Sequence, residues 1–169
     1  LDPDNELCEM AYTLVGKSYQ QVDQHSIAIQ HFKKEMALYP EHSFHYSDIG
    51  NSYLSLSKYY QAIQNYDKDI ELYPKNFLTY RSRGKAYLKL KQYSNAIIDF
   101  TISIELDPNN AVSYFNRFQA FSLLNDSFDI YNNTDFLDAL KLDKNVLNDI
   151  IYSDPNNSFL YYSRGYTYA

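Results

Sequence analysis

The sequence predicts an all-α fold built from repeated pairs of helices. Three stretches align with one another at a constant interval, and the segments before them align at the same interval. The stretches are AIQHFKKEMALYPEH (28–42), AIQNYDKDIELYPKN (62–76) and AIIDFTISIELDPNN (96–110), preceded by AYTLVGKSY (11–19), HYSDIGNSY (45–53) and TYRSRGKAY (79–87). Self-similarity at a fixed period, here about 34 residues, is the signature of a repeat architecture.

Glycine and proline follow the same period. Three of the four glycines and three of the five prolines recur once in each repeat, at Gly16, Gly50, Gly84, Pro40, Pro74 and Pro108. The remaining glycine, Gly165, lies in YYSRGYTY, which matches the segments around the other glycines, and Pro155 lies in SDPNN, which matches the segments around the other prolines. Repeat structure therefore accounts for nearly all of these residues, which leaves none to form a phosphate-binding loop or the sharp turn that presents a catalytic serine.

Each unit reads as two helices joined by a short polar turn. In the second unit, two sets of residues have helical spacing, namely Tyr46, Ile49, Gly50 and Tyr53 in the first helix and Ala62, Ile63, Tyr66 and Ile70 in the second. Gly50 and Ala62 are small, so we expect the two helices to approach closely there. Pro74 ends the second helix because proline lacks an amide donor and clashes with the preceding turn.

The unit resembles the tetratricopeptide repeat (TPR), in which an aromatic residue, Leu-Gly, Tyr, Ala, Phe or Tyr, Ala and Pro occupy fixed places. Those places here hold, in the first unit, Tyr12, Val15, Gly16, Tyr19, Ala28, Phe32 and Pro40; in the second, Tyr46, Ile49, Gly50, Tyr53, Ala62, Tyr66 and Pro74; and in the third, Tyr80, Arg83, Gly84, Tyr87, Ala96, Phe100 and Pro108. One departure recurs, because the second small residue is replaced by Glu35, Asp69 and Ser103.

The resemblance implies a right-handed α-α superhelix, or solenoid, whose first helices line a concave groove. We expect a single array with repeats at 9–42, 43–76 and 77–110, preceded by the end of another repeat or a linker at 1–8. An irregular fourth repeat occupies 111–157 and has about 13 residues more than the regular period. The first helix of a further repeat occupies 158–169. Arrays of this kind are docking platforms for peptides or partner proteins rather than enzymes.

The fourth repeat departs from the pattern in two places. Phe118 stands where glycine is expected, and Lys144 replaces the proline that would end the second helix. Ala139, Leu142, Val146 and Ile150 keep helical spacing across this point. The sequence therefore predicts an elongated second helix that runs through about residue 152, with a possible bend near 143–145, before Pro155 ends it.

Composition excludes several classes of function. The net charge is −6 and the pI about 5.1, which argues against bulk attraction to nucleic acid or to an anionic membrane. No apolar run approaches the roughly 20 residues of a membrane span, and the single cysteine, Cys8, cannot form an internal disulfide. We expect an intracellular, cytoplasmic location. Because the sequence opens on LDPDN without an initial methionine, we also expect it to be part of a longer protein.

Few residues suggest a catalytic, metal-binding or nucleotide-binding site. His42 and His45 have a spacing that could bind a metal, but zinc needs three or four ligands, so both read as histidines at a helix start. Tyrosines recur at one place in the repeats, and we expect them to form core between helices rather than a stack for nucleotide bases; they are Tyr12, Tyr46, Tyr80, Tyr114 and Tyr161. We expect the recurring arginines to pair with acidic residues on neighbouring helices; they are Arg83, Arg117 and Arg164. We predict no catalytic residue, no metal and no cofactor.

The resemblance assigns ligand contacts to fixed positions on each first helix. These positions carry four cations and one anion, Asp48, so the groove has a net charge of +3 in a chain of −6. We predict that the groove binds an acidic, extended segment of a partner protein, with apolar side chains as anchors and amides holding the peptide backbone. The predicted groove residues are Lys17, Phe44, Asn51, Leu78, Arg81, Lys85, Lys89, Phe115, Asn116, Gln119 and, from the terminal helix, Tyr162.

Other interpretations stay open. Some TPR domains clamp the terminal carboxylate of a chaperone with lysine, asparagine and arginine; in one register no clamp position matches here, and in the next only Asn51 does, so we predict a different ligand. The groove positions are also compatible with ordinary solvated helix faces. The alternatives in function are self-association through the terminal helices, RNA binding by related helical repeats, and regulation of an enzyme elsewhere in a longer protein.

Overall fold

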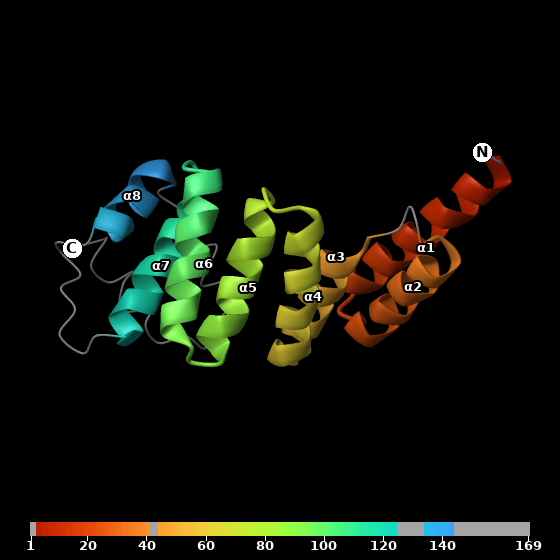
Figure 1. Cartoon of the computed structure of the whole chain (residues 1–169), viewed down its shortest axis with the longest axis horizontal. Coiled ribbons are helices and arrows are strands. Elements are labelled where there is room, and N and C mark those ends of the chain that lie inside the picture. Colours follow the sequence, from red (N-terminus) through yellow and green to blue (C-terminus); the bar gives the residue numbers. More distant parts are fainter. Residues whose placement is uncertain (1–2, 41–43, 125–133, 144–169) are drawn as a thin grey trace. The chain divides into compact units, whose positions relative to one another are not determined.

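A computed structural model describes residues 3–40, 44–124 and 134–143 of the chain, and the regular structure in these ranges is entirely α-helical (Figure 1). Residues 3–10 are described without their side chains. The chain divides into two compact units, Leu1–Gln92 and Tyr93–Ala169, and each is taken by itself below.

The first unit contains five helices: α1 (Pro3–Gln21), α2 (His25–Leu38), α3 (Tyr46–Ser55), α4 (Tyr59–Leu72) and α5 (Phe77–Lys89). Each packs against the next along the chain (Figure 1), which confirms the predicted series of helical hairpins. Because α1 begins at Pro3, residues 3–8 are continuous with the first helix.

Small residues allow close contact within the hairpins, as predicted. A Cβ atom added to Gly16 would lie 2.5 Å from Cε1 of Phe32, and one added to Gly50 would lie 2.6 Å from Cε1 of Tyr66. Both rings are fully buried. The aromatic ring of the second helix therefore fills the space that glycine leaves in the first helix.

The turn after each first helix of this unit has the same backbone form. Asp23, Ser57 and Lys91 occupy the same place in successive repeats, and each has a positive φ, of 57°, 57° and 59°. The next residue donates a backbone hydrogen bond to a carbonyl five residues back, for example from Lys58 to Tyr53 at 2.9 Å. This is the Schellman type of helix ending, which usually places glycine at the left-handed position.

Polar side chains replace small ones at the junctions between repeats. Glu35 accepts a hydrogen bond of 2.6 Å from the Thr13 hydroxyl and lies 3.0 Å from His45 Nε2. Asp69 accepts a hydrogen bond from Thr79. His45 and Thr79 each follow their acid by ten residues, so the recurring departure from the TPR pattern forms a buried polar junction with the next first helix.

The second unit contains α6 (Tyr93–Leu106), α7 (Ala111–Leu124) and α8 (Thr134–Leu142). α7 packs against both other helices. The polar junction between α6 and α7 is formed by uncharged side chains, because the Ser103 and Ser113 hydroxyls lie 2.8 Å apart.

Arg117 donates two hydrogen bonds to Asp135, at 2.8 and 2.7 Å, and Arg83 in the first unit lies 2.6 Å from Asp67. Both arginines pair with acids of a neighbouring helix, as predicted.

The core of this unit is aromatic. Phe118, which stands in the glycine place, is fully buried, and its ring centroid lies 4.9 Å from that of Phe136. α8 ends at Leu142, where the Asp143 amide donates to the Ala139 carbonyl. The predicted continuation of this helix through residue 152, its end at Pro155 and the further repeat at 158–169 lie outside the described residues.

Candidate peptide-binding face

Three of the predicted groove cations lie along one side of α5. Arg81, Lys85 and Lys89 are spaced four residues apart, which places them in one row on the helix surface. Lys89 is exposed, and Arg81 and Lys85 are half-buried. We call these three residues the basic ridge.

The opposite side of α5 explains why the ridge faces outward. Thr79, Tyr80, Gly84 and Ala86 are buried, and Ala86 packs in one apolar cluster with Ala62 and Tyr66 of α4. Thr79 and Ala86 hold this side of α5 against α4, so the ridge positions are turned away from that contact.

The ridge is electrostatically positive at its centre. Burial lowers the pKa of Lys85 to about 8, and the positive charges of Arg81 and Lys89 act in the same direction. A nearby anion would favour the charged form of Lys85 and reverse this shift. The ridge is therefore a place where a bound carboxylate would relieve repulsion among three cations.

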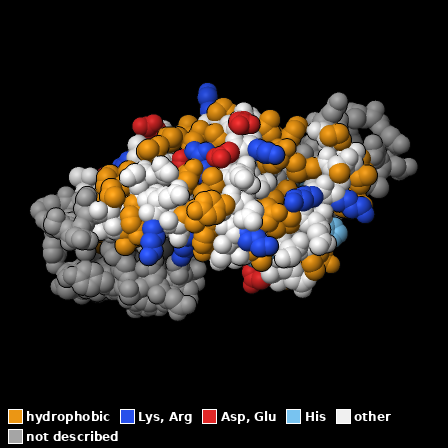
Figure 2. Space-filling view, turned by 60° about the horizontal axis from the view of Figure 1, so that its bottom comes forward, with side chains coloured by type: hydrophobic (Ala, Val, Ile, Leu, Met, Phe, Trp, Pro, Cys, Tyr) orange, Lys and Arg blue, Asp and Glu red, His pale blue; other side chains and the backbone are white. Residues whose placement is uncertain are grey.

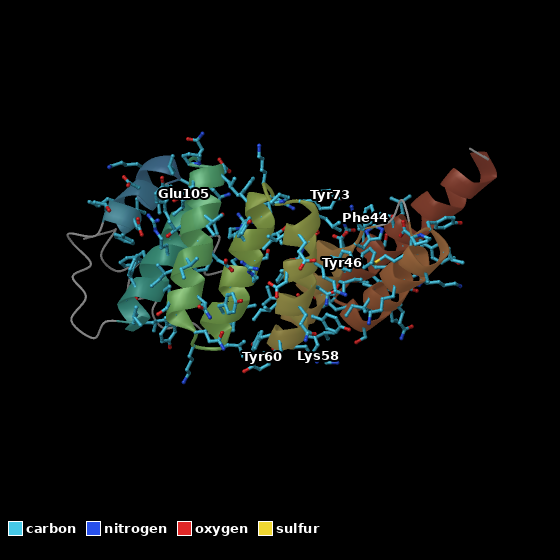
Figure 3. The ribbon with its side chains drawn as sticks, in the orientation of Figure 1. Phe44, Tyr46, Lys58, Tyr60, Tyr73 and Glu105 are labelled. Carbon is cyan, nitrogen blue, oxygen red and sulfur yellow. The ribbon has the colours of Figure 1, made fainter. Side chains whose placement is uncertain are left out.

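Exposed apolar side chains lie at the corner where α4 leads into α5. Leu78, at the start of α5, is 45% exposed, and Phe44 is 38% exposed. The Phe44 ring meets that of Tyr73 edge-on at 6.5 Å, and Figure 3 shows these two side chains together at one end of α3 and α4, with Lys58 and Tyr60 at the other end. We call Phe44, Tyr73 and Leu78 the apolar end.

Tyr73 was missed by the sequence analysis. It lies directly before Pro74, at the end of α4, beside a shallow depression lined by residues 72–77. The signal that could have found it is an aromatic residue where the third repeat has Asp107. Its exposure, 45%, places it at the surface rather than in the core.

The other predicted groove residues of the first unit lie on α1 and α3. Lys17 and Asn51 are both exposed, and the Asn51 side-chain oxygen accepts a hydrogen bond of 2.8 Å from the Tyr66 hydroxyl, which orients the amide. Asp48, the one anion of the groove, lies 3.2 Å from His45 Nδ1. Its charge is thus engaged at the junction between repeats.

His45 forms part of that junction. Burial disfavours its charged form, but hydrogen bonds with Asp48 and Glu35 outweigh burial and raise the pKa of the imidazole. His42 lies outside the described residues. Across the part of the chain that the structure describes, no group of three or more His, Cys, Asp or Glu side chains is placed to hold a metal ion.

The structure corrects three predicted groove residues of the second unit. Phe115, Asn116 and Gln119 are only 0%, 4% and 5% exposed, and the Phe115 ring packs against Phe118 at 5.8 Å and Phe136 at 6.5 Å. They belong to the core of that unit, and a peptide could not reach them in this conformation. Tyr162, and the terminal helix expected to mediate self-association, lie outside the described residues.

Figure 2 shows basic, acidic and hydrophobic side chains interspersed over the face in view. Among the helices described here, none is long and apolar enough to span a membrane.

A helical hairpin repeated at a regular period defines the class of protein, and comparisons with known proteins show which repeat it resembles. A family model described as TPR repeat matches residues 50–91, and one described as tetratricopeptide repeat matches residues 80–110. No curated protein matches the chain. Many solved structures resemble its fold.

Three of these solved structures illustrate the likeness. A MamA RS-1 double mutant is 17% identical with a TM-score of 0.71, covering 80% of this chain and 75% of its own. The Arabidopsis OM64 TPR domain is 22% identical with a TM-score of 0.64, covering 69% and 96%. The first TPR of Spaghetti (RPAP3), bound to the HSP90 peptide SRMEEVD, is 22% identical with a TM-score of 0.65, covering 69% and 92%.

Residues 50–110 thus match models of the tetratricopeptide repeat, and the fold is the α-α solenoid of solved tetratricopeptide-repeat structures. Proteins of this family are generally interaction scaffolds without catalytic activity. The chain is therefore a protein–protein interaction module.

Proposed function

We propose that this module binds an extended, acidic segment of a partner protein on the face formed by α1, α3 and α5 of the first unit. The observation that carries the proposal is the basic ridge, where three cations lie in one row and where burial, together with the two flanking cations, lowers the pKa of the central lysine. In a chain of net charge −6, such a cluster stands out, and concave repeat surfaces suit extended ligands.

The parts of this face have separate roles. Arg81, Lys85 and Lys89 attract acidic side chains, and Lys17 extends the positive surface onto α1. The apolar end supplies contact with a hydrophobic side chain, since aromatic and aliphatic groups that bury area on binding contribute most of the affinity of peptide complexes. Asn51 donates to the peptide backbone from an amide oriented by Tyr66.

The ligand is an internal acidic segment rather than a free carboxyl terminus. The Spaghetti domain binds a peptide with three acidic residues among seven, but the carboxylate-clamp positions of this chain hold other residues, such as Thr13, Asp48 and Ser82. Blocking the terminal carboxylate of an acidic peptide as an amide should therefore leave its affinity nearly unchanged. We further propose that the chain has no catalytic activity of its own and does not bind nucleic acid.

The direct test compares acidic and basic peptides of equal length by fluorescence anisotropy over a range of salt concentrations. We expect the acidic peptide to bind more tightly, and its advantage to fall as salt rises, because exposed charges are screened over about 10 Å at 0.1 M. Equal affinity for both peptides would contradict the proposal.

A further inference from the structure

The geometry points to a specific spacing of acids in the ligand: we infer that the basic ridge selects an extended segment whose acidic residues occupy alternate positions, each meeting one of Arg81, Lys85 and Lys89. This inference rests on the proposed function and adds a sequence rule for the partner. It concerns one helix of one unit, α5.

The spacing of the ridge carries the inference. Residues four apart on an α-helix are separated by about 6 Å along the axis, because each residue rises about 1.5 Å. In an extended chain, alternate side chains point to the same side and are separated by about 6.6 Å. Three acids at alternate positions therefore span about 13 Å, close to the roughly 12 Å between the first and last cation of the ridge.

Other spacings fit less well. Three consecutive acids on an extended segment place the middle carboxylate on the far side from the ridge. Acids four residues apart match the ridge only if the ligand is itself a helix lying along α5. Successive ridge positions also turn by about 40° around α5, which the long side chains of Arg81, Lys85 and Lys89 can follow because of their rotatable stems.

Lys85, the central cation, is the residue whose contact distinguishes a ligand with a correctly placed middle acid. Lys85 is half-buried and flanked by both other cations, so its favourable interaction with a carboxylate is less screened than that of exposed Lys89. Removing Lys85 should abolish the advantage of a correctly placed middle acid and leave the contributions of the outer two. Lys58, an exposed lysine at the start of α4, offers a matched control.

The test uses short peptides capped at both ends, each with three glutamates and the same neutral residues, so that net charge and composition are identical. In one the glutamates are consecutive, in the second they alternate with neutral residues, and in the third they lie four apart. Isothermal titration calorimetry measures their affinities for the wild-type chain, Lys85→Ala and Lys58→Ala.

We expect the alternating peptide to bind about two- to fivefold more tightly than the consecutive one, the size of a single exposed ion pair. The advantage should vanish in Lys85→Ala and persist in Lys58→Ala. Tightest binding of the peptide with acids four apart would overturn the inference in favour of a helical ligand. Equal binding of all three would overturn the spacing rule but leave the proposed acidic ligand in place, and binding no tighter than that of a basic peptide would overturn both.

Discussion

Helices α5 and α7 occupy the same place in successive repeats but differ in the charge and exposure of corresponding side chains. Arg81 and Lys85 of α5 correspond, one repeat later, to Phe115 and Gln119 of α7. The α5 residues are partly exposed and cationic, whereas Phe115 and Gln119 are buried, at 0% and 5% exposure. A position in the repeat thus does not by itself decide whether a side chain faces a ligand or the core.

One substitution within the repeat accounts for part of this difference. Gly84 of α5 corresponds to Phe118 of α7, and Phe118 joins Phe115 and Phe136 in an aromatic cluster. Because a large ring at this place brings its neighbours into the core, the face that is available for binding on α5 becomes packing surface on α7. The candidate site is therefore confined to the first unit.

The largest effect is expected from removing that ring. Phe118→Ala should lower the free energy of unfolding by about 3–5 kcal/mol, the usual cost of truncating a buried phenylalanine. Urea denaturation followed by circular dichroism measures the change. The exposed Phe44→Ala is the control and should cost far less; a loss below about 1 kcal/mol for Phe118→Ala would remove Phe118 as the reason for the difference between α5 and α7.

Adding a side chain at the same repeat position in the first unit should also lower the free energy of unfolding. In Gly50→Ala the new Cβ would approach Tyr66 Cε1 to 2.6 Å, and overpacking of this kind costs about 1–3 kcal/mol. The same denaturation experiment applies, with Tyr66→Leu in the alanine background as a variant that makes room. If Gly50→Ala proved as stable as the wild type, close packing at this place would not explain the periodic glycine.

The pH dependence of binding tests the ridge itself. Since the pKa of Lys85 lies at about 8 in the free chain, Lys85 loses its charge as the pH rises through 8, and affinity for an acidic peptide should fall about two- to fivefold between pH 7 and pH 9. In Lys85→Arg, which stays charged, the profile should be flat. A wild-type profile that is equally flat would mean that Lys85 does not contact the acidic ligand.

The same pKa has a consequence for stability. The lysine takes up protons less readily in the folded chain than in the unfolded one, so the unfolded state binds more protons between pH 8 and the ordinary lysine pKa near 10.4. The contribution of Lys85 to stability therefore rises with pH across this range. Binding and stability should change in opposite directions, which separates loss of a contact from unfolding.

A further effect, on stability alone, concerns the turn that follows α5. Lys91 has φ of 59°, a region that glycine adopts without steric cost. Lys91→Gly should raise the free energy of unfolding by about 1 kcal/mol, and peptide affinity should stay the same because Lys91 is not part of the ridge. Thermal denaturation and anisotropy measure the two quantities; a fall in affinity would extend the binding face into this turn.

The sequence was sufficient for the repeat and for much of its packing. The regular period located the hairpins, and Gly50 and Pro74 indicated a close approach and a helix end, because such residues have strong local effects on backbone geometry. Arg81, Lys85 and Lys89 were among the predicted groove residues, and their spacing places them on one face of α5 because residues four apart share a helix face.

Properties that depend on neighbouring helices could not be predicted. The burial of Phe115 depends on contacts with Phe118 and Phe136, one of which belongs to another helix. Glu35 occupies a place that usually holds a small residue, and its contacts with Thr13 and His45 lie across the junction between repeats. The exposure of Tyr73 likewise follows from the geometry of the corner between α4 and α5.

The central claim, that the acidic ligand lies along α5, is tested most directly by reversing the charge of the ridge. The double variant Arg81→Glu/Lys85→Glu should lose at least tenfold in affinity for an acidic peptide, because two attractive pairs become repulsive, and should bind the matched basic peptide more tightly than the wild type does. Lys58→Glu, with its charge change at the other end of α4, should alter neither affinity by more than about twofold. If the double variant kept the wild-type preference for the acidic peptide, the ligand would lie elsewhere and the account of this face would be contradicted.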